Sequence, residues 1–228
     1  MGEGCVFAGA KEMILAIYCA GGLGKEVIEL ARWINRWDAI VFVDDVTDAK
    51  MYAGASIHRF EEMKNFHDEL EFVIATGEPA GREKLFRKIK DAGYKLTTIV
   101  APGCTMFPGS SLGEGCVIVD ATTSISTNVV IGDNVLINGR ACIGHDAVIG
   151  NNCVMSVYSF VGGGTKIGNN VYVAPGAMLK DKISVGDDAI IGMGAVVLRH
   201  VRSAAIMLGN PAKRVGINTE KTVFNMFN

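Results

Sequence analysis

A repeat of six residues runs through the second half of this chain and restricts the folds open to it. From position 125 to 197 an aliphatic residue or methionine stands at every sixth position, and a small or β-branched residue follows four positions later in nearly every unit. No α-helix has a period of six, and an ordinary strand alternates with a period of two. The pattern is typical of short strands separated by tight turns, with the aliphatic and small side chains pointing inward. The aliphatic positions are Ile125, Ile131, Ile137, Ile143, Ile149, Met155, Val161, Ile167, Val173, Leu179, Val185, Ile191 and Val197.

Glycine and asparagine mark the expected turns of this repeat, as in "GDN" at 132–134 and "GNN" at 150–152 and 168–170. Both residue types tolerate a positive φ angle, so we expect them to adopt it there. Two earlier units, beginning at Leu112 and Ile118, join the repeat after a slip of one residue. If three faces make one coil, residues eighteen positions apart stack on one another.

Residues 13–100 follow a different pattern, in which apolar strands alternate with amphipathic helices. We expect strands at 14–19, 39–45, 71–78 and 95–100, and helices at 26–37 and 80–94. This alternation predicts a parallel sheet with a ligand crevice at the carboxyl ends of its strands. In the first helix the apolar residues recur at helical spacing. They are Val27, Ile28, Leu30, Ala31 and Ile34.

Two features of this first half are candidates for ligand binding. The turn "AGGLG" at 20–24 lacks the spacing of a dinucleotide fingerprint, but backbone N–H groups at a helix N-terminus suit a phosphate. Asp44 and Asp45 end the second strand, where carboxylates can accept hydrogen bonds from ribose hydroxyls or a base. A tight strand-to-helix turn and a solvated acidic strand end explain the same residues equally well.

Composition excludes several classes of protein. The net charge of −2 and the pI of about 6.1 argue against a nucleic-acid partner. No apolar run approaches the roughly 18–20 residues of a membrane span, and no basic region precedes residues 13–24 as in a signal peptide. The six cysteines are scattered without a CxxC pair, which suits reduced thiols better than disulfides or a zinc site. We therefore expect a cytoplasmic protein without a membrane span or a metal.

A histidine followed by an aspartate stands at a turn of the repeat, in "INGRACIGHDAVIG" at 137–150. Equivalent positions of other units hold Asp133, Asn151, Asn169 and Asp187, so His145 could be a solvated turn residue. Imidazole also titrates near neutral pH, which suits a general base. The spacing alone leaves both interpretations open.

Residues 100–215 resemble the hexapeptide repeat of left-handed parallel β-helix acyltransferases. With the glycine turn, the "DD" after the second strand and "ATGE…R" after the third, residues 14–215 resemble the bacterial nucleotide-sugar acetyltransferases. These enzymes N-acetylate 4-amino sugars on a nucleotide carrier, in the bacillosamine and perosamine pathways, and sialic acid O-acetyltransferase-like proteins belong with them.

The resemblance implies a Rossmann-like nucleotide-sugar-binding domain at 13–100 and a left-handed β-helix acetyltransferase domain at 101–215. Tails at 1–12 and 216–228 flank them. It also implies acetyl-CoA as the acyl donor, no metal, and a homotrimer with active sites between subunits.

The same resemblance assigns roles to individual residues. His145 is the implied general base, and Asp146 orients it and favours the imidazolium as the proton arrives. Transfer is direct, so Cys142 and Cys153 are not expected to be nucleophiles. The implied substrate-binding residues are Gly21, Gly22, Leu23, Gly24, Asp44, Asp45, Gly77, Arg82 and Asn138. The implied acetyl-CoA-binding residues are Gly163, Ala174, Pro175, Gly192, Met193 and Lys213, with Arg214 beside the last.

Several functional alternatives follow from these features. N-acetylation of a nucleotide-linked amino sugar is the main prediction, while O-acetylation of a sugar hydroxyl, as in the sialic acid type, needs nearly the same groups. Leu23 replaces a histidine usual in the family, so the sugar, its carrier and the acyl chain length stay open. A non-catalytic trimeric scaffold conflicts with the His–Asp pair and with the terminal motif "GNPAKRV" at 209–215. A β-helix carbonic anhydrase needs three metal-binding histidines, whereas the repeats contain only one before their end.

Overall fold

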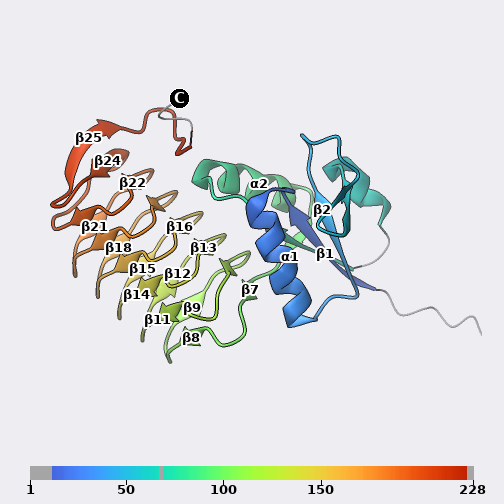
Figure 1. The fold of residues 1–228 in the computed structure, drawn as a ribbon, viewed down its shortest axis with the longest axis horizontal. Coiled ribbons are helices and arrows are strands. Elements are labelled where there is room, and N and C mark those ends of the chain that lie inside the picture. The colour runs from blue at the N-terminus through green and yellow to red at the C-terminus, as the bar shows by residue number, and fades with distance from the viewer. Residues whose placement is uncertain (1–11, 67–68, 225–228) are drawn as a thin grey trace, which may run out of the picture.

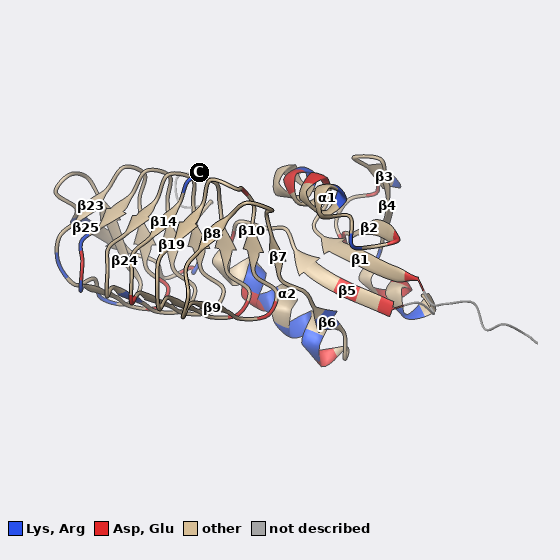
Figure 2. Cartoon of the chain, turned by 90° about the horizontal axis from the view of Figure 1, so that it is seen from below, with Lys and Arg blue, Asp and Glu red and all other residues tan. Residues whose placement is uncertain are grey.

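The computed structural model describes residues 12–66 and 69–224, which form an α/β domain followed by a three-sided prism (Figure 1). The predicted tail at 1–12 lies outside the described residues apart from Glu12. Within the described ranges, no helix is long and apolar enough to cross a membrane. Charged residues are concentrated in the two long helices and are sparser along the prism (Figure 2).

The first domain is a six-stranded sheet with helices, and its strand order is β3-β4-β2-β1-β5-β6. All neighbouring strands are parallel except β3 and β4, which form an antiparallel hairpin. The strands are β1 (Met13–Tyr18), β2 (Ala39–Val43), β3 (Met51–Tyr52), β4 (Ala55–His58), β5 (Glu69–Ile74) and β6 (Lys95–Leu96). The helices are α1 (Gly22–Ile34), the 3₁₀ helix η1 (Phe60–Asn65) and α2 (Pro79–Asp91).

The 3₁₀ helix η1 was not predicted, and the ends of several elements are shifted, since the strand predicted at 71–78 is β5 at 69–74. Three further differences bear on the architecture of this domain. Helix α1 begins at Gly22 and not at residue 26, because the glycine turn itself enters the helix and Lys25 N donates to Gly21 O. The hairpin β3–β4 was not predicted. The strand predicted at 95–100 is split: β6 ends the α/β sheet, whereas β7 (Ile99–Val100) begins the prism. The chain therefore changes sheets at 97–98.

The prism is a left-handed parallel β-helix built from strands of two residues in three sheets, apart from two longer strands at its end that pair antiparallel. We call the three sheets faces C, D and E. Face C contains β7, β10 (Val117–Ile118), β13 (Leu136–Ile137), β16 (Val154–Met155), β19 (Tyr172–Val173), β22 (Ile190–Ile191), β24 (Ala205–Leu208) and β25 (Lys213–Ile217). Face D contains β8 (Thr105–Met106), β11 (Ser124–Ile125), β14 (Cys142–Ile143), β17 (Phe160–Val161), β20 (Met178–Leu179) and β23 (Val196–Val197). Face E contains β9 (Ser111–Leu112), β12 (Val130–Ile131), β15 (Val148–Ile149), β18 (Lys166–Ile167) and β21 (Ser184–Val185).

The six-residue register describes the interior of the prism correctly. Every aliphatic position from Ile125 to Val197 is buried in one continuous core. The slip is also confirmed, because Val117 pairs with Leu136, nineteen positions on, whereas Val130 pairs with Val148, eighteen positions on. The extra residue lies in the turn at 119–123.

The positive φ predicted at the turns of the prism is confirmed for Asn134, Asn152 and Asn170 but not for the glycines that precede them. A positive φ recurs at every sixth residue, but in "GDN" and "GNN" it falls on the asparagine. The preceding glycines are needed for close approach between coils: a Cβ on Gly150 would lie 2.6 Å from the backbone oxygen of Gly168. Between residues 128 and 194 the positions with positive φ are Asn128, Asn134, Arg140, Asp146, Asn152, Tyr158, Gly164, Asn170, Gly176, Lys182, Asp188 and Gly194.

The α/β domain packs against face C of the prism. The outward side chains of Val117, Leu136 and Val154 are buried in the same apolar cluster as Val27 and Leu30 of α1. Faces D and E carry exposed apolar residues instead, among them Phe160 and Met178 on face D. Face C is therefore the face of the prism that contacts the first domain.

Candidate functional site

His145 lies at the corner between faces D and E, after β14 and before β15. Its Nδ1–H donates to Asp146 Oδ2 at 2.8 Å, and Asn128 Nδ2, one coil earlier, donates to Asp146 Oδ1 at 3.3 Å. These two hydrogen bonds, chiefly that of His145, hold the pKa of Asp146 below its usual value. The side chains of His145 and Asp146 are 63% and 58% exposed. The corner therefore presents an oriented imidazole to the outside of the prism.

Gly163 lies one coil beyond His145 and directly against its ring. A Cβ on Gly163 would stand 2.6 Å from His145 Nε2 and 2.9 Å from Cε1. The backbone of Gly163 is fixed from the following coil, because Asp181 Oδ1 accepts its N–H at 2.9 Å. The observed position of the imidazole therefore requires glycine at 163.

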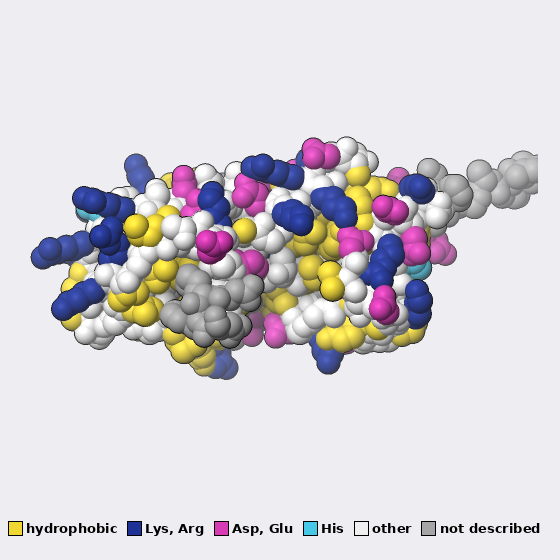
Figure 3. All heavy atoms as spheres, turned by 90° about the horizontal axis from the view of Figure 1, so that it is seen from above, with side chains coloured by type: hydrophobic (Ala, Val, Ile, Leu, Met, Phe, Trp, Pro, Cys, Tyr) yellow, Lys and Arg dark blue, Asp and Glu magenta, His cyan; other side chains and the backbone are white. Residues whose placement is uncertain are grey.

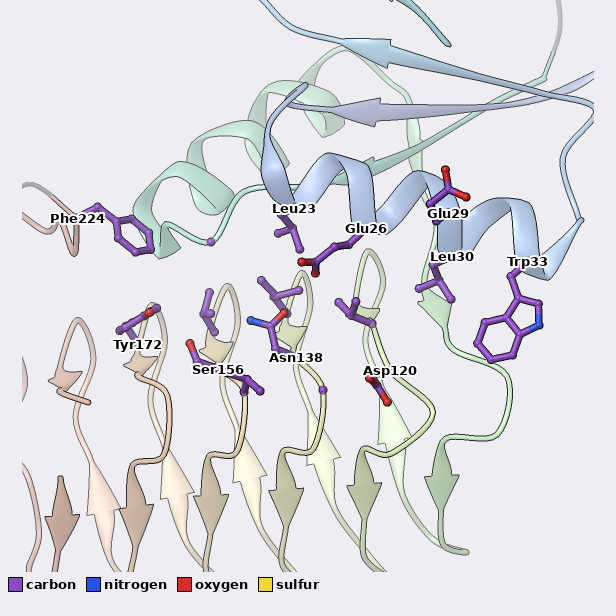
Figure 4. Close-up of a pocket in the computed structure, with 16 residues that line it drawn as sticks. Leu23, Glu26, Glu29, Leu30, Trp33, Asp120, Asn138, Ser156, Tyr172 and Phe224 are labelled. Atoms are coloured by element: carbon purple, nitrogen blue, oxygen red, sulfur yellow. The ribbon is translucent and has the colours of Figure 1, made fainter. Parts of the chain in front are cut away.

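A second feature is a cleft of about 820 Å³ between α1 and the prism (Figure 4). Helix α1 contributes Glu26 and Glu29, and the corner between faces C and D contributes Asp120, Asn138 and Ser156. Three predicted substrate-binding residues meet here: Leu23, Gly77 and Asn138. The aromatic or apolar lining includes Leu23, Leu30, Trp33, Tyr172 and Phe224. His145 does not line this cleft, because Asn138 and His145 occupy different corners of the prism.

The acidic pair shapes the loop beside the glycine turn. Asp44 accepts the backbone N–H groups of Ala20, Val46 and Thr47 at 2.9–3.1 Å. Partial burial opposes its charge, but these hydrogen bonds hold the pKa of Asp44 below its usual value. The Asp44–Ala20 hydrogen bond fastens the end of β2 to the glycine turn. A contact between Asp44 and a nucleotide stays a prediction.

Asp45 is engaged with different partners. Its carboxylate accepts hydrogen bonds from Lys88 Nζ at 2.6 Å, from Phe60 N at 2.9 Å and from the Tyr18 hydroxyl. Partial burial opposes the charge here too, but Lys88 and Tyr18 hold the pKa of Asp45 low. Asp45 therefore links α2 to the ends of β1 and β2.

Arg82 does not occupy the place predicted for a substrate contact. Its side chain is 0% exposed, and its guanidinium donates to four oxygens at 2.8–3.0 Å. Two of the acceptors are the backbone and side-chain oxygens of Asn134 in the prism, and two are the carbonyls of Ile74 and Thr76. Burial lowers the pKa of Arg82 to about 10, so it stays charged at neutral pH. Arg82 joins the two domains and leaves no surface for a ligand.

The predicted donor-binding residues fall on two corners. Gly163 shares the corner between faces D and E with His145, whereas Ala174, Pro175, Gly192 and Met193 lie at the corner between faces C and D. Face D separates the two groups, and Phe160 and Met178 are exposed on it. Lys213 belongs to β25 at the end of the prism, where Lys and Arg side chains gather (Figure 3). A single chain therefore does not bring these residues together.

Much of the cleft lining was not predicted from the sequence. Ser156 could have been found, since it stands eighteen positions after Asn138 and hence one coil along the same corner. Glu26 and Trp33 lie on the predicted first helix, but no pattern marked the side that faces the prism. Nothing in the sequence marked Phe224. Among residues 12–66 and 69–224, no three His, Cys, Asp or Glu side chains are grouped to hold a metal.

Comparison with protein families matches residues 14–89 to the PglD N-terminal domain and residues 164–199 to the bacterial transferase hexapeptide repeats. The matches place a PglD-type N-terminal region before a region of hexapeptide transferase repeats. The predicted family resemblance and fold class are thereby confirmed. A search of curated protein sequences found no significant match.

Several solved structures are similar to this chain over most of their length. PerB from Caulobacter crescentus, in complex with CoA and GDP-perosamine, is 29% identical with a TM-score of 0.82, over 89% of this chain and 97% of PerB. The acetyltransferase domain of PglB from Neisseria gonorrhoeae FA1090 is 28% identical with a TM-score of 0.83, over 89% and 99%. WeeI from Acinetobacter baumannii AYE is 25% identical with a TM-score of 0.83, over 89% and 100%.

Proposed function

We propose that this protein is an acetyl-CoA-dependent acetyltransferase that N-acetylates the 4-amino group of a nucleotide-linked amino sugar. The observation that carries the proposal is the His145–Asp146 pair on an exposed corner of a hexapeptide prism. Asp146 engages Nδ1, so Nε2 is the nitrogen left to accept a proton. Such a base is needed because an amine that attacks a thioester must lose a proton.

The proposed reaction is a direct transfer. The amine nitrogen attacks the thioester carbonyl carbon of acetyl-CoA while His145 Nε2 takes a proton from that nitrogen. The new C–N bond forms, the C–S bond breaks, and the CoA sulfur leaves and receives the proton. Asp146 keeps Nδ1 protonated and stabilises the imidazolium that forms. Cys153 is no nucleophile in this scheme, because burial raises its pKa to about 12.

The similar structures support this chemistry. PerB was solved with CoA and GDP-perosamine bound together, and the PglB domain was solved with acetyl-coenzyme A. Simultaneous binding of donor and nucleotide sugar is what direct transfer requires. We extend this arrangement to the present chain.

The charge of the cleft favours an amino sugar over a sialic acid. Its lining carries Glu26, Glu29 and Asp120, and no Lys or Arg of the described chain lines it. An amino group that arrives protonated is attracted by these carboxylates and loses that proton to water before it attacks, whereas the carboxylate of a sialic acid is repelled. The diphosphate of a nucleotide sugar can lie at the other end, where the N-terminus of α1 presents backbone N–H groups.

We further infer that the complete site forms between subunits of a homotrimer. The cleft and His145 lie at opposite edges of face D, so a neighbouring prism is needed to bring a base to a sugar held in the cleft. The exposed apolar column of Cys142, Phe160 and Met178 on face D is suited to such packing. Lys213 and Arg214, both exposed in β25, are suited to the phosphates of the donor.

The test is a thiol-release assay with acetyl-CoA and a panel of UDP-, GDP- and dTDP-linked 4-amino sugars. We expect turnover with at least one of them and an amide product by mass spectrometry. His145→Asn should lower kcat by about 10²–10⁴-fold. Its thermal stability should be unchanged, because asparagine already occupies the equivalent turn positions 151 and 169. Turnover of free sialic acid alone, or a fully active His145→Asn variant, would contradict the proposal.

A further inference from the structure

The chain does not end where the prism does. After β25 it turns back toward the first domain as a segment that we call the C-terminal strap, residues 218–224 (Figure 1). Asn218 N donates to Ala204 O at 2.7 Å, Asn218 Nδ2 donates to Asp188 O at 3.0 Å, and Lys221 forms an ion pair with Asp188 at 3.1 Å. The base of the strap is therefore fixed on the prism.

The other end of the strap is held by the first domain. The carboxylate of Glu78 accepts hydrogen bonds from Val223 N at 2.9 Å, Phe224 N at 3.3 Å and the Thr222 hydroxyl at 3.5 Å, all at Oε2. Glu78 immediately precedes α2 and follows Gly77, a predicted nucleotide-binding residue. One carboxylate thus anchors the strap beside the loop that is expected to meet the substrate.

This anchoring places the ring of Phe224 in the cleft (Figure 4). The ring meets Tyr172 edge-on, with centroids 5.8 Å apart and planes at 77°, and a Cβ on Gly77 would lie 3.7 Å from it. Phe224 is nevertheless 59% exposed. A residue that only completed a core would be buried, whereas Phe224 lines the cleft and keeps more than half of its surface exposed.

The position of the ring matches the needs of a nucleotide. Leu23, in the first turn of α1, and Gly77 line the same cleft, so the ring stands near the helix N-terminus that suits a diphosphate. A nucleobase has a planar π-face, and aromatic side chains stack on such faces with little regard to the base. Phe224 and Tyr172 supply two aromatic surfaces at this end.

We propose that the strap positions Phe224 as the aromatic contact for the base of the carrier nucleotide. The inference rests on the proposed function for the presence of a nucleotide, but it concerns binding and not acyl transfer. Glu78 is then a positioning residue that acts through Phe224.

The test measures binding of UDP, GDP and dTDP to the full chain by calorimetry, without donor or sugar. The unmodified protein should bind at least one of them. Phe224→Ala should weaken that binding about tenfold, while Phe224→Trp should retain it. Ile217→Ala, an exposed apolar residue just before the strap, is the matched control and should leave binding unchanged.

The Glu78→Ala variant distinguishes an effect of the strap on nucleotide affinity from a general effect on folding. As a single substitution it should weaken nucleotide binding. Combined with Phe224→Ala it should cause no further loss of affinity, because both changes remove the same contact. Unchanged or tighter binding by Phe224→Ala would overturn the inference, as would absence of binding by the unmodified protein. Nucleotide binding that depends on Phe224 without any acetyl transfer would leave the inference standing and contradict only the proposed function.

Discussion

The two domains of this chain are stabilised in different ways. In the prism the same contacts recur from coil to coil: short parallel strands, a positive φ at every sixth residue and buried aliphatic columns. In the α/β domain a given polar contact occurs only once, such as those of Arg82 with the prism and of Glu71, on the strand between β1 and β6, with Arg36. Loss of one contact is therefore expected to matter more in the first domain. In the prism the sensitive positions should be those where the backbones of neighbouring coils approach most closely.

The largest effect expected from this comparison is at Arg82. Arg82→Met keeps much of the side-chain volume but leaves four buried oxygens without their donor. Because each unsatisfied buried group is costly, we expect a loss of about 3 kcal/mol or more in the free energy of unfolding, measured in urea. Arg87→Met, on the exposed side of the same helix, is the control and should change it by less than about 0.5 kcal/mol. Equal effects of the two changes would refute a special role for Arg82.

Two glycine substitutions in the prism test how closely neighbouring coils must approach. In Gly150→Ala the new Cβ meets the backbone of the next coil, so we expect a loss of about 1–3 kcal/mol in stability. In Gly163→Ala it meets the His145 ring, which can move, so stability should change little while kcat falls about 10–100-fold. The KM for acetyl-CoA separates two roles of Gly163. An unchanged value supports positioning of His145, and a raised KM with normal kcat would indicate a donor contact instead.

The smallest predicted effect concerns Glu71, whose side chain is 7% exposed. Burial opposes its charge, but hydrogen bonds from Lys95 and Trp37 and the nearby Arg36 hold its pKa below the usual value. A lowered pKa contributes stability above the ordinary value of about 4.3, which disappears as the pH falls through the lower value. Glu71→Gln should therefore cost about 1 kcal/mol at pH 7 and clearly less at pH 3. A constant difference across this range in pH-dependent melting would show that the charge is not responsible.

The sequence predicted the prism in more detail than the α/β domain. The period of six located the inward residues, the slip near Ile118 and the exposed corner that carries His145, because repetition makes each position visible many times. The hairpin β3–β4 was missed, since its first strand is two residues long and its turn lies at Ala53 and Gly54. Arg82 has the sequence signature of an ordinary helical arginine. Only its pairing with Asn134, 52 positions away, reveals that it is buried.

The candidate site was predictable to a similar degree. The register placed His145 and Asp146 side by side at a turn, and the structure has them there, while their role as base and partner stays a prediction. The cleft could not be derived, because it requires the packing of α1 on face C and the return of the strap, both of which join segments far apart in the sequence. The lining of Glu26, Ser156 and Phe224 depends on that packing.

Asn138 and Ser156 stand one coil apart on the wall of the cleft, and coils are separated by the spacing of adjacent strands, about 4.8 Å. Equivalent side-chain positions therefore recur along this wall at a fixed interval, the spacing between coils. A hydrogen-bonding group can be moved along it only in whole steps, by exchanging residues eighteen positions apart. A sugar whose polar substituents do not match that interval cannot be accommodated by a small adjustment of the prism. Substrate preference can therefore be changed gradually only through α1 and the C-terminal strap, which lie opposite this wall.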